Sequence, residues 1–237
     1  MADQPRLPLT PVIDHSIDAL IISESNRAAW ERLERWATWP GGSMILSGPE
    51  GSGKSHMGDI WALRANAMRV SALASMDQAL AAFHDHRGRL LLDDVDRGLD
   101  DEAIFLLLDL VKVQGGALLL TSRSPPADWP FRSPDLASRC LALPRSHLSE
   151  PDDALLQGVL RRQCRARFME MSDDVARFVS RHMERSFIAA RRVAEALDEN
   201  VVRGARPVSK AAARRALEKI GYGRATLEDE EETGEIT

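Results

Sequence analysis

A glycine-rich stretch between an apolar run and a helical pattern constrains this chain more than any other feature. It reads Gly48-Pro49-Glu50-Gly51-Ser52-Gly53-Lys54-Ser55 and matches the pattern G-x-x-x-x-G-K-[ST]. Glycines leave the backbone free to surround an anion with N–H groups, and the positive end of a following helix attracts the same anion. The stretch therefore predicts a phosphate-binding loop. Its predicted ligand-binding residues are Gly48, Pro49, Gly51, Ser52, Gly53, Lys54 and Ser55.

Two side chains at the end of this loop have predicted chemical roles. Lys54 is expected to reach the β- and γ-phosphates of a nucleotide, and the Ser55 hydroxyl is expected to bind Mg²⁺. The alternative is a Gly/Ser-rich turn without a ligand. The strand-like run 43–47 before the loop and the helical pattern after it favour the nucleotide site over that turn.

Composition narrows the class of protein. The chain has 237 residues, of which 44% are hydrophobic, so it is long enough to bury a sizeable core. Its net charge of -5 argues against a protein that wraps around nucleic acid, although local basic patches are compatible with it. Cys140 and Cys164 fit neither a metal pattern nor a disulfide framework, and no apolar run approaches the length of about 18 residues that a membrane helix needs. We therefore expect a cytoplasmic protein without membrane contact.

Apolar runs alternate with helical patterns between residues 43 and 143, which is typical of a parallel sheet with crossover helices. Each run is apolar at its centre, as expected for strands covered on both faces. The predicted fold class is α/β, with a five-stranded parallel sheet between helices. The expected strands are 43–47, 68–72, 89–93, 117–121 and 139–143, and Cys140 is expected to be a buried residue of the last one. The expected helices are 26–37, 54–66, 76–84, 101–113 and 134–138.

After Ser149 only helical periodicity remains, which predicts a second, all-helical module. Its expected helices are 151–168, 172–183, 186–203 and 209–219. From residue 223 the chain turns polar and acidic, a composition that is typical of disorder. The predicted division is a flexible peptide 1–11, an α/β domain 12–147, a helical domain 148–222 and an acidic disordered tail 223–237.

An acidic pair, Asp93-Asp94, ends the apolar run 89–92. The carboxyl end of a parallel strand faces the ligand crevice, so these carboxylates are expected beside the phosphate-binding loop. There Asp93 would hold Mg²⁺ through water and Asp94 would orient the attacking water. The alternative is a solvated strand end, which the spacing from the loop disfavours.

The run 118–120 ends in Thr121 at the same edge of the predicted sheet. A hydroxyl at this place would contact the γ-phosphate or the attacking water. Because Ser124-Pro125-Pro126 follows, a capping turn is the alternative interpretation.

Together these motifs resemble the AAA+ ATPases of the DnaA replication-initiator group, over about residues 12–220. The resemblance is carried by the phosphate-binding loop with His56 after it, the Asp93-Asp94 pair and the segment 119–126. Residues 20–26 resemble the segment that passes the adenine in that group, which implies nucleotide contacts for Ile21 and Ile22. Residues 134–139 resemble its arginine-finger box, which implies that Arg139 acts in trans on a neighbour's nucleotide. The implied ligands are ADP or ATP with Mg²⁺, and the implied helical domain is a lid.

DnaA proteins continue past the lid into a DNA-binding domain, whereas this chain turns acidic after Gly223, so it resembles the Hda-type regulators that are related to DnaA. The peptide 4–9 resembles the motif by which such regulators bind the β sliding clamp of DNA polymerase III. Its prolines restrict the free peptide and so reduce the entropy lost on binding. A proline-rich arm without a partner is the alternative. The implied clamp contacts are Gln4, Leu7, Pro8 and Leu9.

The resemblance implies a negative regulator of chromosomal replication initiation that stimulates ATP hydrolysis by DnaA through Arg139. DNA would be contacted only indirectly, and a homodimer is compatible with the sequence. Two alternatives stay open: an autonomous DNA-associated ATPase or helicase-loading factor, and a clamp adaptor without catalysis. For Arg139 itself, the alternative is a helix-end arginine that interacts with a nearby carboxylate or the helix dipole.

The lid departs from the family pattern, because Ile188 stands where a sensor arginine is expected. At helical spacing Arg185, Ile188 and Arg192 share one face, so Arg185 or Arg192 would reach the phosphates, or both are solvated. The opposite face, with Phe187, Ala190, Ala194 and Leu197, is expected to be buried. ATP turnover by the protein itself is therefore expected to be weak or absent. Asp109 and Lys112 are interpreted as an exposed helical pair without a further role.

Overall fold

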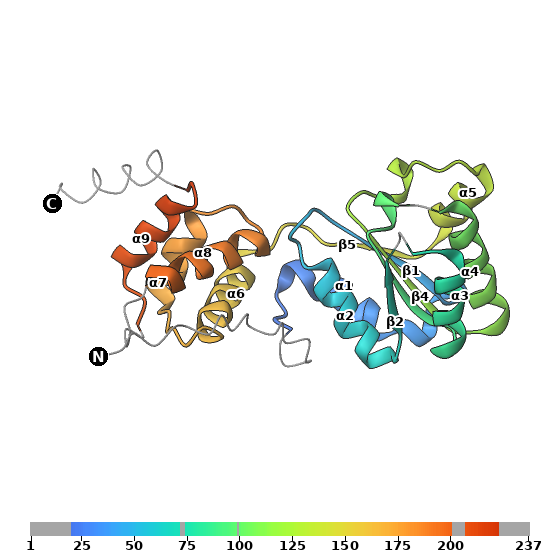
Figure 1. The fold of residues 1–237 in the computed structure, drawn as a ribbon, viewed down its shortest axis with the longest axis horizontal. Helices are drawn as coiled ribbons and strands as arrows, with labels where there is room; N and C mark the ends of the chain where they lie inside the picture. The colour runs from blue at the N-terminus through green and yellow to red at the C-terminus, as the bar shows by residue number, and fades with distance from the viewer. Residues whose placement is uncertain (1–19, 72–73, 99, 201–206, 223–237) are drawn as a thin grey trace, which may run out of the picture.

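A parallel sheet forms the centre of the larger part of the molecule (Figure 1). The computed structural model describes residues 20–71, 74–98, 100–200 and 207–222, and within these ranges the sheet has five strands in the order β2-β3-β4-β1-β5. All neighbouring strands pair in parallel, as the alternation of apolar runs and helices predicts. The strands are β1 (Ser43–Ser47), β2 (Met68–Ser71), β3 (Arg89–Asp93), β4 (Ala117–Ser122) and β5 (Arg145–His147). The predicted peptide 1–11 and tail 223–237 lie outside the described residues.

Helices cover both faces of the sheet, because alternate strand residues point to opposite sides. Met44 and Leu46 pack with α1 (Glu24–Glu34) and α2 (Lys54–Ala65) on one face. Ile45 packs on the other face, with α3 (Met76–Asp85), α4 (Asp101–Gln114) and α5 (Pro134–Ala142). Short 3-10 turns η2 (Trp36–Thr38), η3 (Pro40–Gly42), η4 (Val95–Arg97) and η5 (Pro126–Asp128) connect these elements. The result is a three-layer arrangement that presents the carboxyl ends of the strands at one edge.

The last predicted strand, 139–143, is wrong. Residues up to Ala142 belong to α5, and β5 begins only at Arg145. Ser133 caps the helix by accepting a hydrogen bond from the N–H of Leu136, and Pro134 occupies its first turn, where its fixed φ is favourable. Leu136 and Cys140, four residues apart, are both fully buried, so the apolar residues follow helical rather than strand spacing. Cys140 is therefore buried as expected, but from a helix.

The C-terminal part of the described chain is helical and has its own apolar core. Its helices are α6 (Asp153–Arg165), α7 (Asp173–Arg181), α8 (Phe187–Asn200) and α9 (Lys210–Lys219). Ala190, Ala194 and Leu197 are fully buried, so α8 turns the predicted apolar face inward. The side chains of Asp152, Ser172 and Ser209 cap α6, α7 and α9 respectively.

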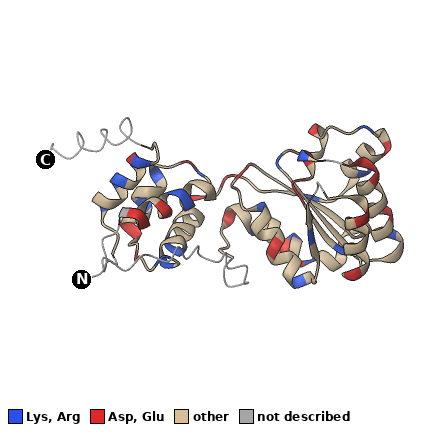
Figure 2. Ribbon diagram, viewed as in Figure 1, with Lys and Arg blue, Asp and Glu red and all other residues tan. Residues whose placement is uncertain are grey.

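Charged residues of both signs are interspersed over the helices of both parts (Figure 2). Arg161 of α6 forms an ion pair with Asp173, and Arg167, which follows that helix, lies 3.6 Å from Glu195. These two arginines are thus paired with acidic residues of the same helical part. Among the described residues, no helix combines the length and the apolar character needed to cross a membrane.

Candidate nucleotide-binding site

The glycine-rich loop joins β1 to α2 and has a backbone that glycine makes possible. Gly51 and Gly53 have φ values of 75° and 96°, which other residues rarely adopt. A Cβ on Gly53 would lie 2.6 Å from the ring of Phe187, and one on Gly51 would lie 2.8 Å from Ser186. The N–H of Phe187 also donates to the carbonyl of Gly51 at 2.9 Å. The start of α8 therefore rests directly on the loop, and only glycine leaves room for it.

Lys54 and Ser52 place polar side chains inside this loop. The Nζ of Lys54 donates to the Pro49 carbonyl at 2.8 Å, and only 6% of the residue is exposed. Burial lowers the pKa of Lys54 below its ordinary value, and the nearby charge of Asp94 opposes that shift. The Ser52 hydroxyl is buried and has no hydrogen-bond partner among the described residues. A buried donor without a partner inside a ring of glycines fits the oxygen of a bound phosphate.

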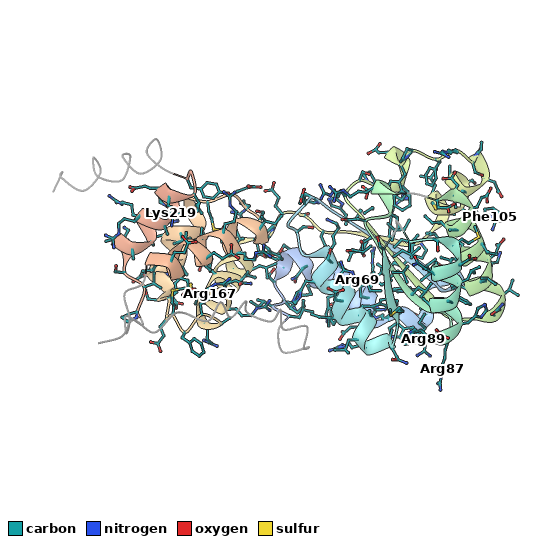
Figure 3. All side chains as sticks on the ribbon, viewed as in Figure 1. Arg69, Arg87, Arg89, Phe105, Arg167 and Lys219 are labelled. Carbon is teal, nitrogen blue, oxygen red and sulfur yellow. The ribbon has the colours of Figure 1, made fainter. Side chains whose placement is uncertain are left out.

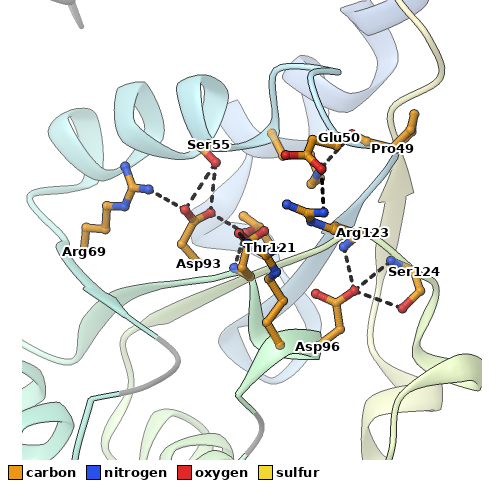
Figure 4. A network of polar contacts seen from close by, with 12 residues as sticks. Pro49, Glu50, Ser55, Arg69, Asp93, Asp96, Thr121, Arg123 and Ser124 are labelled. Atoms are coloured by element: carbon orange, nitrogen blue, oxygen red, sulfur yellow. Dashed lines mark hydrogen bonds and ion pairs between the residues drawn. The ribbon is translucent and has the colours of Figure 1, made fainter. Parts of the chain in front are cut away.

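Asp93 lies at the carboxyl end of β3, beside the loop (Figure 4). The Ser55 hydroxyl donates to its two carboxylate oxygens at 3.3 and 3.2 Å. Thr121 donates to the same carboxylate, and Arg69 forms an ion pair with it. Ser55 and Asp93 are thus adjacent, and a hydroxyl with a carboxylate is a ligand set that suits Mg²⁺.

Thr121 connects the acidic pair to β4. Its hydroxyl donates to Asp93 and accepts from the backbone N–H of Asp94 at 3.0 Å, and the residue is fully buried. A contact in which Thr121 donates to a γ-phosphate would require this hydroxyl to leave Asp93, because its single proton is used there. In this structure Thr121 orients the two aspartates.

Asp94 has left-handed backbone geometry, with φ at 56°. Its carboxylate lies 3.7 Å from the guanidinium of Arg97. The negative charge of Asp94 also acts to raise the pKa of Lys54, against the larger effect of burial. One side-chain oxygen of Asp94 is therefore placed toward Arg97, while the residue as a whole stays partly exposed at the carboxyl edge of the sheet.

Asp96 and Arg123 also belong to this network, although sequence reasoning assigned them no role (Figure 4). One carboxylate oxygen of Asp96 accepts from the N–H groups of Arg123 and Ser124 and from the Ser124 hydroxyl, at 2.9 to 3.0 Å. The Arg123 guanidinium lies 2.5 Å from Glu50 of the loop. The sequence holds one indication of this contact between Asp96 and Arg123. Both charged residues follow closely after strands, β3 and β4, that end at the same edge of the sheet.

A pocket of about 530 Å³ lies where α1 and α6 begin. Its lining residues are Ile21, Ile22, Ser23, Glu24, Asp152, Asp153, Ala154 and Arg185. Arg185 donates to Asp153 at 2.6 Å and to the Pro151 carbonyl at 3.0 Å. The structure thus brings the predicted residues Ile21, Ile22 and Arg185 together in one pocket, whose lining is partly polar and partly apolar.

Ile188 and Arg192, which share one face of α8, lie at different places relative to the glycine-rich loop. A Cβ on Gly51 would lie 3.5 Å from Ile188, so Ile188 is beside the loop, and 46% of it is exposed. Arg192 is exposed on the next turn of α8. Burial raises the pKa of Tyr222, and the positive charge of Arg192 partly opposes that rise, so Arg192 lies near Tyr222. An apolar side chain, that of Ile188, therefore stands beside the loop at the position where the resemblance to DnaA proteins implies an arginine.

Arg139 is remote from the loop. It lies on α5, at the end of the α/β part that is farthest from the helical part (Figure 1). It forms ion pairs with Asp109 of α4 and with Asp135, and its guanidinium lies 3.9 Å from the centre of the Phe105 ring. Asp109 is at the surface as interpreted, but the interpretation that it has no further role is wrong, because the fold brings α5 alongside α4 and Asp109 pairs with Arg139.

Comparisons with known proteins identify the fold. No model of a protein family matches the chain, and no curated protein matches its sequence. Domain III of the replication initiation protein DnaA from Thermotoga maritima is similar, with a TM-score of 0.69 and 17% identity over 91% of this chain and 98% of that one. The RuvB Holliday junction branch migration motor of Thermotoga maritima has a TM-score of 0.67 and 21% identity, over 86% and 72% of the two chains.

The replication initiator DnaA bound to AMPPCP and single-stranded DNA gives a TM-score of 0.56 at 15% identity, over 94% of this chain and 92% of that one. At such identities a structural match shows the fold and not the activity. The chain has the AAA+ P-loop fold, a parallel sheet between helices followed by a helical region.

Proposed function

We propose that this chain binds ADP or ATP with Mg²⁺ and acts as an Hda-type negative regulator of chromosomal replication initiation. In this proposal it stimulates ATP hydrolysis by DnaA through Arg139. One observation carries the proposal. The loop lies against the helical part, while Arg139 is 37% exposed at the far end of the α/β part, which supports a role for Arg139 on another molecule rather than on its own loop (Figure 1).

The residues of the loop fit a nucleotide's phosphates. The backbone of Gly51 and Gly53 and the hydroxyl of Ser52 would surround the anion, and Lys54 would exchange its bond to Pro49 for one to a phosphate oxygen. Ser55 and Asp93 would hold Mg²⁺, which supplies charge neutralisation at the phosphates. Ile21, Ile22 and Arg185 would line the nucleoside side, since they share one pocket.

Weak ATP turnover by the protein itself is part of the proposal. Ile188 is apolar and stands beside the loop, so it cannot stabilise charge on a γ-phosphate as an arginine would. Arg185 is tied to Asp153, and Arg192 lies a turn farther along α8. A bound nucleotide would then serve mainly to hold the lid against the α/β part, through the contact between Phe187 and Gly51.

The clamp interaction rests on sequence alone. Gln4, Leu7, Pro8 and Leu9 lie outside the described residues, and the proposal is that they bind the β sliding clamp. DNA would then be approached only through the clamp. Formation of a homodimer is compatible with the proposal and is not required by it.

The test combines DnaA loaded with ATP, the clamp, DNA and this protein, and measures ADP formed on DnaA. We expect the protein to raise hydrolysis above the intrinsic rate of DnaA. Arg139→Ala should reduce the rise by about 10³-fold or more, as for other arginine fingers. Arg177→Ala is the matched control, because Arg177 is an exposed arginine of the helical part, on α7, where it pairs with the exposed Asp174.

Two results would contradict the proposal. A rise that survives in Arg139→Ala would show that Arg139 is not the activating group. In the second result, the unaltered protein leaves ATP hydrolysis by DnaA at its intrinsic rate and still binds the clamp through residues 4–9. That result would identify it as the non-catalytic adaptor.

A further inference from the structure

Arg69 lies on β2, at the edge of the sheet (Figure 3), and joins two carboxylates. One nitrogen of its guanidinium donates to both oxygens of Asp59 on α2, at 2.7 and 2.9 Å. The other terminal nitrogen forms an ion pair with Asp93. The planar guanidinium is thus fixed at both ends, which a flexible ammonium would not achieve.

The contact matters because Asp93 is the predicted carboxylate for Mg²⁺ (Figure 4). One of its oxygens accepts from Thr121 and Ser55, and the other accepts from Ser55 and Arg69. Only 10% of the Asp93 side chain is exposed, so solvent screens its contact with Arg69 weakly. A permanent cation therefore binds the carboxylate oxygen that faces β2.

We propose that the guanidinium of Arg69 competes with Mg²⁺ for the Asp93 carboxylate. The competition sets the Mg²⁺ concentration that nucleotide binding requires. The inference rests on the nucleotide-binding part of the proposed function and does not involve DnaA or the clamp. A metal ion at Asp93 is repelled by the guanidinium, and a water on that metal must displace an existing hydrogen bond to the carboxylate.

The charge on Arg69 is retained in this setting. A guanidinium stays protonated throughout the pH range in which proteins are folded. Loss of a proton therefore offers no way to release the carboxylate. Release requires movement of the side chain, of which 45% is exposed to solvent on the outer side of β2.

A purely structural role predicts something different. If Arg69 only ties β2 to α2, its removal lowers stability and leaves the Mg²⁺ requirement unchanged. The measurement that separates the two roles is the affinity of the isolated full-length protein for a fluorescent ADP, such as methylanthraniloyl-ADP, as a function of free Mg²⁺ concentration.

Arg69→Gln is the test variant, and Arg64→Gln is the matched control. Arg64 is also an exposed arginine, on the neighbouring helix α2, but it pairs with Glu34 and stacks on Trp30, away from Asp93. We expect Arg69→Gln to lower the Mg²⁺ concentration at half-maximal nucleotide affinity by about tenfold, since one like charge near the metal is removed. Arg64→Gln should leave that concentration within about twofold of the unaltered protein.

An unchanged Mg²⁺ midpoint in folded Arg69→Gln would overturn the inference and leave the proposed nucleotide site intact. If Arg69→Gln does not fold, Asp59→Asn replaces it, because it removes the carboxylate that shares the Arg69 guanidinium with Asp93. That variant should raise the midpoint by about threefold, since the charge of Arg69 near the metal is then less neutralised, and an unchanged midpoint overturns the inference as well. If the unaltered protein binds no nucleotide at any Mg²⁺ concentration, both this inference and the proposed site are wrong.

Discussion

The guanidinium of Arg139 on α5 is held by the carboxylate of Asp109 on α4. The two side chains are 37% and 42% exposed, so the pair is at the surface. Such pairs contribute little to stability, because water solvates both charges well when they separate. The contact therefore orients Arg139 over the Phe105 ring rather than stabilising the fold, and it leaves the guanidinium accessible.

We predict that Asp109→Ala lowers the free energy of unfolding by about 1 kcal/mol or less. Arg139→Ala should cost no more than about 2 kcal/mol, since it also loses the contact with the Phe105 ring. Urea denaturation of the unaltered protein, the two single variants and the double variant measures both costs and their coupling. A loss of more than about 4 kcal/mol in either single variant would make the pair a structural element and weaken the assignment of Arg139 as a finger.

Thr121→Val should destabilise the protein at the acidic pair. Valine has nearly the same shape but removes the hydroxyl, so the Asp94 N–H and the Asp93 carboxylate each lose a partner in a buried place. We expect a loss of about 1–3 kcal/mol in the free energy of unfolding, measured by urea denaturation, and weaker binding of fluorescent ADP.

Thr121→Ser is the control for this prediction, because it keeps the hydroxyl and removes only a methyl group. It should preserve nucleotide affinity. Equal nucleotide affinity in the valine and serine variants would show that the hydroxyl does not organise Asp93 and Asp94.

Gly53→Ala should disturb the contact between the loop and α8. The added Cβ would lie 2.6 Å from the Phe187 ring, so the ring or the loop must move. The matched control is Gly115→Ala. Gly115 also has a positive φ, of 80°, but no atom lies within 4 Å of the added Cβ. Both variants carry backbone strain, and we expect Gly53→Ala to cost about 1–3 kcal/mol more.

Combining Gly53→Ala with Phe187→Ala checks the cause. Removal of the ring should recover most of the extra cost, so the double variant should be more stable than the sum of the single losses predicts. Strictly additive losses, obtained from urea denaturation of all the variants, would mean that the ring is not what opposes the added Cβ.

Cys140 and Cys164 should be unreactive in the folded protein. Both residues are fully buried, and burial is the main cause that raises the pKa of each thiol from 9.0 to about 12. The thiolate is the reactive form, so we expect neither cysteine to react with Ellman's reagent at pH 8 until guanidinium unfolds the chain. Cys140→Ala should halve the label that the unfolded chain takes up.

These pKa shifts also set a direction for stability. Between pH 9 and about 12 the unfolded chain loses thiol protons that the folded protein keeps, so the contribution of each thiol to stability falls as the pH rises through that range. Rapid labelling of the folded protein at pH 8 would contradict the burial of both residues.

The amino-acid pattern alone was sufficient to place Ser55 next to Asp93. A phosphate-binding loop follows one strand, an acidic pair follows another, and in a parallel sheet both strands end at the same edge. The physical basis is local: glycine conformations and apolar runs are properties of short segments. The parallel pairing of the strands within the described residues follows the same logic, apart from the segment 139–143, where apolar residues four apart belong to a helix. The order β2-β3-β4-β1-β5 is not a property of the short segments and was not predicted.

The partners of the arginines could not be derived in that way. Arg69 meets Asp59 and Asp93, and Arg139 meets Asp109, across elements that are 10 to 30 residues apart in the chain. Long charged side chains have no periodicity that reveals a partner, because their contacts depend on how neighbouring helices and strands are rotated against one another. The loop and its acidic pair are therefore encoded by short segments, whereas the cation beside Asp93 and the orientation of Arg139 arise only when those segments pack.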